Sequence, residues 1–326
     1  MKKEEYKNLV GARLKRVPQW KILLAYILMV IAFCCTADGF MTGGNLVNVL
    51  RQSSTEMIVA MGMTFVLLIG GIDLSVGKVA MLAGTITAGL LVKGVPVAVA
   101  ILVGLAAGVV CGLINGLVVA KLNIPPFITT LAMMNVAEGA ALLYCGGKQI
   151  SGLPDGFKEI GRGYLLGIPV SVWIMLVVIV IWAVVLNKTT YGKRMVAIGG
   201  NQDVARLSGI AVTKIKISVY AISGLMAALT GIIYTARFAS SQPTLGDGLE
   251  MNAIAAAVLG GTSLVGGRGS VLGTVIGTFF LMTMSNGLNL LGVPSFWQMI
   301  IKGVLIVVSV ILYENLKGKK NKKVKK

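Results

Sequence analysis

The stretch YGKRMVAIGGNQDVARLSGI, residues 191–210, is a polar island between two long apolar runs. Residues 169–186 precede it and residues 217–236 follow it, and neither run contains a charged side chain. Within the island, Asn201 is a residue type that caps the start of a helix, and Gly209 is the type that ends one in a left-handed conformation. About two helical turns fit between these signals, which is too short to cross a membrane. We therefore expect a short helix that lies along the membrane surface.

Basic side chains assign the island to one side of the membrane. The positive-inside rule places Lys- and Arg-rich loops in the cytoplasm, and the island with its flanks contains Lys193, Arg194, Arg206, Lys214 and Lys216. Two interpretations remain open at this point. The loop either only fixes the orientation of the chain, or it is a docking surface for a partner.

The composition indicates a membrane protein. Of the 326 residues, 56% are hydrophobic and 13% are charged, whereas about a quarter of the residues in soluble domains are charged. The 42 glycines suit membrane helices, which approach one another closely where side chains are small. The net charge of +18 lies mostly at the chain ends and in short loops, so we assign it to membrane orientation and not to nucleic-acid binding.

Several kinds of chemistry are excluded or disfavoured by residue usage. The sequence has no histidine, which excludes histidine-based catalysis and histidine metal ligands. The four cysteines lie in or beside apolar segments without C-x-x-C spacing, so we expect buried thiols and no metal site.

The hydropathy pattern predicts an all-α polytopic membrane protein of about ten transmembrane helices. The expected crossings are residues 22–37, 57–69, 79–92, 96–120, 127–145, 169–186, 217–236, 251–260, 271–291 and 294–313. Residues 1–21 form a cytoplasmic N-terminal segment, residues 22–313 the transmembrane domain with a cytoplasmic loop at 188–216, and residues 314–326 a basic cytoplasmic tail. Residues 38–56 are expected outside as a loop or short surface helix, and residues 146–168 form the longest external loop.

The distribution of Lys and Arg supports this topology. With both termini in the cytoplasm, 23 of these residues lie inside and 6 outside. Lys78 and Lys121 are counted at cytoplasmic edges, and Lys302 falls within the last crossing. Inverting the chain would reverse the bias, so we expect both termini in the cytoplasm.

Two glycine-rich stretches resemble each other at an offset of 190 residues, GGIDLSVGK (70–78) and GGTSLVGGR (260–268). They indicate an internal duplication. Interrupted helices at matching places in two halves expose backbone polar groups, which suits a transport pathway, although glycines also simply permit close packing. The candidate pathway residues are Gly70, Gly71, Asp73, Ser75, Gly77, Gly260, Gly261, Ser263, Gly266 and Gly267.

Two charged residues fall in the middle of apolar segments, Glu138 and Lys302. Charges at that depth cost about 2.5–3.5 kcal/mol each on insertion scales and normally face a partner or a cavity. They are candidates for a mutual ion pair or for separate partners.

Three motifs resemble the permease subunits of ribose-type bacterial ABC sugar importers. They are GGIDLSVG (70–77), GGNQDVARLSGI (199–210) and GLEMNAIAAAVLGGTSLVGGRG (248–269). The chain departs from the family pattern at Val204, where the family often has alanine, at Gln202 and Asp203, where it often has acids, and at Asn252, where it usually has aspartate.

The resemblance implies a binding-protein-dependent importer of the bacterial inner membrane. Two permease copies would form the pathway for ribose, xylose, galactose or a similar small sugar, with an ABC ATPase subunit beneath each and an extracytoplasmic sugar-binding protein outside. The resemblance also implies that the short helix docks into the ATPase, through Asn201, Ala205, Arg206, Ser208 and Gly209.

The sequence contains no G-x-x-x-x-G-K-[ST] motif for ATP phosphates. The chain is therefore expected to be no enzyme and to bind no cofactor, with ATP and Mg used by the partner ATPase. The alternative that remains is an ion-coupled secondary transporter of small polar solutes, which needs no docking helix and uses intramembrane acids.

The predicted topology can be tested by cysteine labelling. With the four native cysteines replaced, Gly200→Cys should react with a membrane-impermeant thiol reagent only from the cytoplasmic side, and Gly156→Cys only from outside. The reverse pattern of labelling in intact and opened cells would contradict the orientation.

Overall fold

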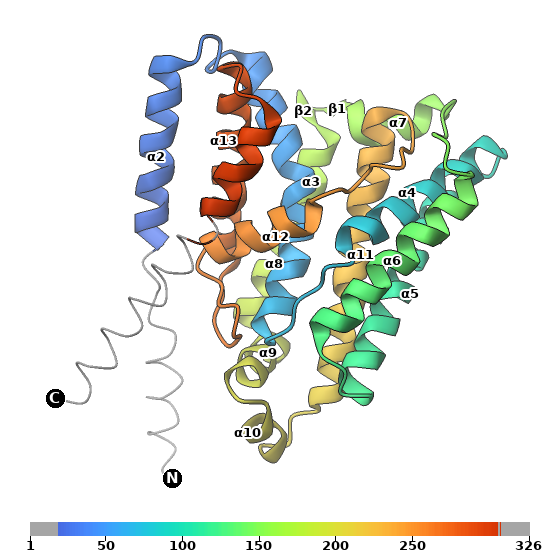
Figure 1. Cartoon of the computed structure of the whole chain (residues 1–326), viewed down its shortest axis with the longest axis vertical. Helices are drawn as coiled ribbons and strands as arrows, with labels where there is room; N and C mark the ends of the chain where they lie inside the picture. The colour runs from blue at the N-terminus through green and yellow to red at the C-terminus, as the bar shows by residue number, and fades with distance from the viewer. Residues whose placement is uncertain (1–18, 306, 308–326) are drawn as a thin grey trace.

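The computed structural model describes residues 19–305 and residue 307, which form a domain of packed helices with one small β-hairpin (Figure 1). Within these residues, five helices are long and apolar enough to cross a membrane. They are α5 (Val97–Lys121), α6 (Pro126–Cys145), α8 (Val170–Lys188), α11 (Val212–Phe238) and α13 (Val271–Leu290). The prediction of an all-α polytopic membrane protein is confirmed at this level.

The other apolar helices are shorter or interrupted. They are α2 (Gln19–Thr36), α4 (Val76–Val92) and α12 (Leu249–Leu259). At 11 residues, α12 is about half the length that a membrane crossing needs. The helix at the expected crossing of residues 251–260 is therefore too short to cross a membrane by itself, and α12 lies in the interior of the domain (Figure 1). A further helix covers residues 295–305, and the rest of the tenth expected crossing lies outside the described residues, as do residues 1–18 and 308–326.

The second expected crossing begins earlier than the hydropathy indicated. Helix α3 runs without a break from Gly43 to Leu68, so residues 43–56 are not a separate surface element. Ser53, Ser54 and Thr55 are fully buried within this helix, and the hydroxyls of Ser54 and Thr55 donate to carbonyls three residues earlier. Polar residues lower the local hydropathy here, but bonds to the helix backbone allow hydroxyls to lie inside the bundle.

The long external loop contains structure that the hydropathy did not predict. Helix α7 (Asp155–Arg162) is followed by β1 (Tyr164–Leu165) and β2 (Ile168–Pro169), an antiparallel hairpin. Leu166 and Gly167 both have positive φ, as a two-residue hairpin turn requires. In α7, Lys158 Nζ lies 2.8 Å from Asp155 Oδ1, and this bond lowers the pKa of Asp155.

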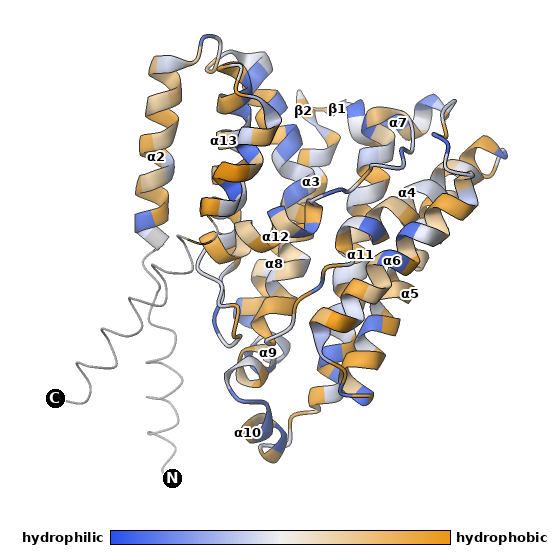
Figure 2. Ribbon diagram, in the orientation of Figure 1, coloured by the Kyte–Doolittle hydropathy of each residue, from blue (hydrophilic) through white to orange (hydrophobic). Residues whose placement is uncertain are grey.

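The outer helices present apolar surface, as lipid contact requires. Figure 2 shows α2 largely in hydrophobic colours, whereas α10 (Gln202–Leu207) shows both hydrophilic and hydrophobic residues. Cys34 and Cys35 are exposed on α2, so the expectation that all four thiols are buried is wrong. Cys111 is buried, and Cys145 is intermediate. The described part of the chain holds no group of side chains suited to a metal ion.

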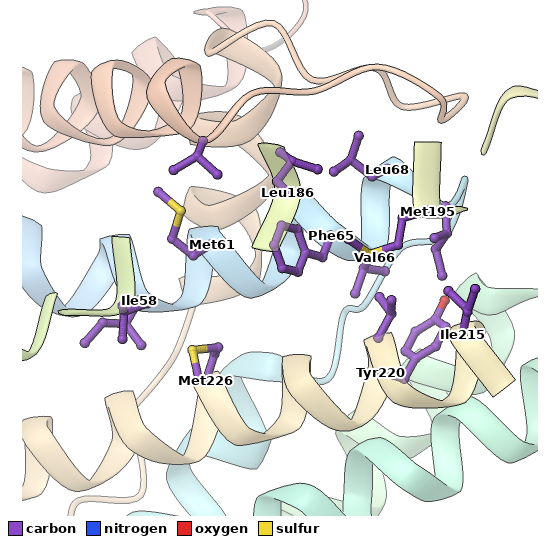
Figure 3. Close-up of a cluster of buried hydrophobic side chains, with 14 of the residues drawn as sticks. Ile58, Met61, Phe65, Val66, Leu68, Leu186, Met195, Ile215, Tyr220 and Met226 are labelled. Carbon is purple, nitrogen blue, oxygen red and sulfur yellow. The ribbon is translucent and has the colours of Figure 1, made fainter. Parts of the chain in front are cut away.

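Helix α3 lies at the centre of the largest hydrophobic cluster (Figure 3). Its buried residues include Met61 and Phe65, which pack near Met226 of α11 and Leu186 of α8. The ring of Phe65 lies 5.1 Å from that of Trp182. Because α3 packs against α8, α11, α12 and α13, a helix from the first part of the chain is enclosed by helices from the second half.

A glycine seam joins α5 to α11. Four glycines repeat at every fourth position of α5 and so share one face of that helix, at Gly104, Gly108, Gly112 and Gly116. A methyl group on Gly112 would overlap the Tyr220 carbonyl and lie 2.9 Å from the Ala221 Cα. The two backbones therefore touch directly, in the manner of small-residue packing between membrane helices.

Gly112→Ala should destabilise the domain by about 1–3 kcal/mol, because overpacking a close helix contact forces the backbones apart. Gly139→Ala on α6 is the matched control, since a methyl group there meets nothing within 4 Å, and it should be neutral or stabilising by up to about 1 kcal/mol. The thermal unfolding midpoints of both variants in detergent check this, and equal midpoints would contradict the seam.

Candidate functional site: a glycine junction and a polar cavity

The break after α3 is a regular helix ending. Gly70 N–H donates to the Leu67 carbonyl and Gly71 N–H to the Val66 carbonyl, both at 2.9 Å, and Gly70 has φ +75°. This is a Schellman ending, which needs a residue in the left-handed conformation.

The break after α12 has the same geometry. Gly261 N–H donates to Val258 O at 2.8 Å and Thr262 N–H to Ala257 O at 2.9 Å, with Gly261 at φ +89°. Gly261 and Gly70 are the equivalent residues, so the structural offset at the turns is one residue longer than the offset of 190 that the two sequence stretches indicate. Asp73 and Ser263, which that offset matches, are not equivalent.

The two breaks meet each other and the loop that contains α10 at a glycine junction, which we define as Gly70, Gly199, Gly200, Gly266 and Gly267. Gly267 N–H donates to Leu68 O at 2.9 Å. A methyl group on Gly266 would lie 2.8 Å from Gly70 N and 2.9 Å from Gly199 O, and one on Gly267 would lie 2.9 Å from Gly200 N. Three chain segments thus pack backbone to backbone, and no local sequence pattern indicates this contact.

The third segment of the junction is the end of α9 (Thr190–Gly200), a helix that the sequence analysis did not predict. Met195 and Ile198 are buried, which fixes α9 against the bundle. The Tyr191 hydroxyl lies 2.6 Å from Ser218 Oγ of α11, and burial raises the pKa of this phenol. The junction glycines therefore end a helix that is itself anchored.

Helix α10 follows directly and matches its predicted signals. Asn201 Oδ1 accepts from the N–H groups of Asp203 and Val204, each at 3.0 Å, so Asn201 is the N-cap. Gly209 has φ +78°, and its N–H donates to Arg206 O at 3.0 Å.

One face of α10 packs against the rest of the domain, and the other face is exposed. Ala205 is 3% exposed, whereas Val204 and Leu207 are 57% and 89% exposed. Arg206 and Ser208 are also exposed, and α10 lies at the end of the described domain opposite α7 (Figure 1).

The segment between α3 and α4 is fastened by hydrogen bonds to buried side chains. Asp73 accepts from Ser75 Oγ at 2.6 Å and from Ser223 Oγ at 2.8 Å. Asn115 Nδ2 in turn donates to Ser75 Oγ at 3.0 Å. Asp73 is 1% exposed, so this candidate pathway acid holds the broken helix in place and does not line the cavity described below.

The remaining candidate glycines lie at close helix contacts. Gly71 faces the Tyr220 hydroxyl, and Gly77 lies against the carbonyl of Gly246. Gly260 touches the Gly273 backbone of α13. Each of these contacts joins a broken segment to a neighbouring element.

The two intramembrane charges do not pair with each other. Glu138 Oε1 lies 2.7 Å from Lys78 Nζ, which also lies 2.6 Å from Asp247 Oδ1. The Lys78 side chain is only 14% exposed, so its expected position at the cytoplasmic edge is wrong. Lys302 Nζ instead lies 3.4 Å from Asn252 Oδ1.

A cavity of about 270 Å³ lies between α3, α11 and the segment that leads into α12. Its lining is polar and aromatic, with no Lys or Arg among the described residues: Glu56, Tyr234, Phe238, Gln242, Thr244, Leu245, Gly246, Asp247 and Leu249. None of these residues is a predicted site residue. The hydropathy places both Glu56 and Asp247 in external loops, whereas the structure brings them to one cavity.

Known proteins similar to this chain are transport permeases. Residues 45–310 match a family model described as the permease component of a branched-chain amino acid transport system. A ribose import permease protein of Bacillus subtilis is 50% identical over 291 residues, which cover 89% of this chain and 90% of that protein.

More distant relatives extend this pattern. A ribose import permease protein of Escherichia coli strain K12 is 44% identical, with 90% of this chain and 92% of the relative covered. An L-arabinose transport system permease protein of the same strain is 38% identical, with 90% and 89% covered. No solved structure matches the chain.

Gly267→Ala should loosen the glycine junction. Gly292→Ala is the matched control, because both glycines have φ near +70° while a methyl group on Gly292 would meet no atom within 4 Å. Each variant should lose about 1–2 kcal/mol from the left-handed backbone, and Gly267→Ala should lose about 1–3 kcal/mol more from the backbone overlap. Hydrogen–deuterium exchange of residues 190–200 should quicken only in Gly267→Ala, and unchanged exchange in both variants would refute the junction.

Proposed function

Since the chain belongs to the family of ABC-importer permease components, we propose that it carries a small sugar, ribose or a related monosaccharide, into the cytoplasm. A permease component is the membrane subunit of its importer, and ATP is hydrolysed by a different subunit. Family membership therefore decides against the ion-coupled carrier.

The choice of sugar over amino acid rests on the cavity as well as on the relatives. An amino acid carries a carboxylate, which recognition sites normally pair with a cation or with free N–H groups. The described lining residues include two acids, Glu56 and Asp247, and no cation. A neutral polyol, whose hydroxyls donate to carboxylates, suits this lining better.

We also propose the full membrane topology of about ten crossings, with α12 and the extended segment after it together making one of them, both termini in the cytoplasm and an internal duplication. The opposite placement of α10 and α7 in the domain supports it (Figure 1), as do the matching turns at Gly70 and Gly261. The duplicated unit is a helix that ends in a glycine turn, a short extended segment and a second helix.

The observation that carries the transport mechanism is the exposed face of α10. Val204, Arg206 and Leu207 project from a helix that its N-cap and its Schellman ending keep rigid. Exposed apolar side chains beside a cation suit a protein surface with carboxylates. We assign this face to the ATPase subunit, with Asn201, Ala205, Ser208 and Gly209 shaping the helix.

The complete importer in this proposal contains two copies of the chain, two ATPase subunits and an extracytoplasmic sugar-binding protein. ATP and Mg bind to the ATPase alone. Closure of the ATPases would move α10, and the glycine junction would pass the movement to both broken helices. The pathway then alternates between its two openings because nucleotide binds the two states with different affinity.

Arg206→Glu tests the docking assignment. Reversing this charge should lower co-purification of the ATPase and sugar uptake by about tenfold or more, because a charge-assisted contact becomes a repulsion. Lys193→Glu on α9, also exposed, is the matched control for loop charge and orientation. If both variants lowered co-purification and uptake equally, or if neither did, the docking assignment would be wrong. The basic residues around α10 would then only orient the chain in the membrane.

A further inference from the structure

We propose that the cavity beside Glu56 is a sugar-binding subsite of the transport pathway, with Glu56 as its buried hydrogen-bond acceptor. The inference rests on the proposed function and adds the residues that contact the substrate. Four side chains carry it besides Glu56: Tyr234, Phe238, Gln242 and Asp247.

One carboxyl oxygen of Glu56 accepts hydrogen bonds from the protein, and the other has no hydrogen-bond partner among the described residues. Oε1 accepts from the Asn252 amide at 3.3 Å and from the Tyr234 hydroxyl at 3.4 Å. Oε2 is buried and makes no hydrogen bond within the described residues, and the residue is only 8% exposed. A buried acceptor without a partner is rare because its desolvation is not compensated. In this proposal the ligand reaches this oxygen from the adjoining cavity, and one of its hydroxyls donates the missing hydrogen bond.

The position of Glu56 is fixed by residues around it. Lys302 Nζ lies 3.4 Å from Asn252 Oδ1, which turns the Asn252 amide group toward Glu56. Lys302 and Asn252 are therefore positioning residues, and their arrangement explains a cation in the middle of an apolar segment. A preorganised acceptor of this kind discriminates strongly between a substrate with a hydroxyl and one without.

The opposite side of the cavity supplies adaptable polar groups. The Gln242 side-chain amide is partly buried and has no hydrogen bond to another described residue, so both its donor and its acceptor are free. Asp247 has one oxygen on Lys78 and a side chain that is 53% exposed. These residues lie on the segment between α11 and α12, where Gly246 has φ +86°.

Two aromatic residues contribute apolar surface to the cavity. The rings of Tyr234 and Phe238 are stacked, with centroids 5.8 Å apart and planes 11° from parallel. A sugar ring has hydroxyls at its edge and C–H groups on its faces, so it suits a site with acceptors on one side and aromatic rings on another. A Tyr whose hydroxyl bonds Glu56 contributes to both parts.

The size and charge of the cavity narrow the ligand class. At about 270 Å³ it is slightly smaller than typical ligand pockets, which span roughly 300–1,000 Å³. A single monosaccharide fits this volume better than a disaccharide. The described lining residues include no cation, and the neighbouring Lys78 ammonium is already paired with Glu138 and Asp247, which disfavours sugar phosphates.

The test uses the complete importer in proteoliposomes, with its ATPase and binding protein, and labelled ribose outside. Glu56→Gln keeps the shape of the side chain and replaces one carboxyl oxygen by an NH2 group, so uptake should fall about tenfold or more. Gln242→Ala should lower uptake severalfold, while ATPase co-purification stays normal for both. Asp155→Asn, an exposed acid of α7 outside the cavity, is the control and should leave uptake unchanged.

A second measurement detects binding at the site directly. In a variant without the four native cysteines, Gln242→Cys should react with a neutral maleimide, and ribose should slow the reaction severalfold while leucine and Mg²⁺ should not. Protection by leucine or Mg²⁺ in place of ribose would overturn the subsite, and so would wild-type uptake by both cavity variants. If Glu56→Gln fails to assemble, the protection measurement alone decides.

The two proposals fail in different ways. If the wild-type complex takes up no ribose and no other monosaccharide, the proposed function is wrong. If wild-type uptake is normal and neither cavity variant nor maleimide protection responds, only the subsite is wrong.

Discussion

Direct contact between backbones, made through glycine, is the constraint on which this structure depends. A membrane helix gains little from burying apolar side chains away from lipid, so its association relies on close packing and on hydrogen bonds. The seam of α5 meets α11 with Gly112 against the Tyr220 carbonyl, and the junction brings Gly267 against Gly200. The same residue type therefore joins the helices of the bundle and connects the segments at its α10 end.

The interrupted helices require a second form of support. Each Schellman ending satisfies carbonyls of the helix it ends, but the extended segments that follow have backbone groups to be paired inside the domain. Asp73 fastens the first segment by accepting from Ser75 and Ser223, and Thr130 Oγ1 accepts from Leu74 N–H at 3.1 Å. Asp73, a candidate pathway residue in the sequence, therefore stabilises the extended segment through hydrogen bonds. The acids that line the cavity, Glu56 and Asp247, come from segments that the hydropathy places outside.

What could be predicted from the sequence depends on local chemistry. Asn201 and Gly209 carry their capping function in their residue types, so α10 could be placed between them. The helical class and most apolar spans followed from uninterrupted hydropathy. The predicted extent of α3 is too short because its serines and threonine lower the hydropathy, although Ser54 and Thr55 bond to their own backbone. Pairings such as Lys78 with Asp247, or Lys302 with Asn252, join residues far apart in the chain, and no local pattern encodes them.

Helix α3 connects the two features that matter for transport. Glu56 lies in its middle at the cavity, and Leu68 at its end accepts the Gly267 N–H in the junction. Twelve residues of helix separate them, which corresponds to about 18 Å. A helix buried along this length does not bend easily, because its neighbours pack against it on several sides. In the proposed mechanism, a displacement of the junction by α10 would therefore tilt or shift α3 as a rod, and Glu56 would move with it relative to Gln242. The proposal thus couples the movement of α10 to the shape of the cavity through one rigid helix.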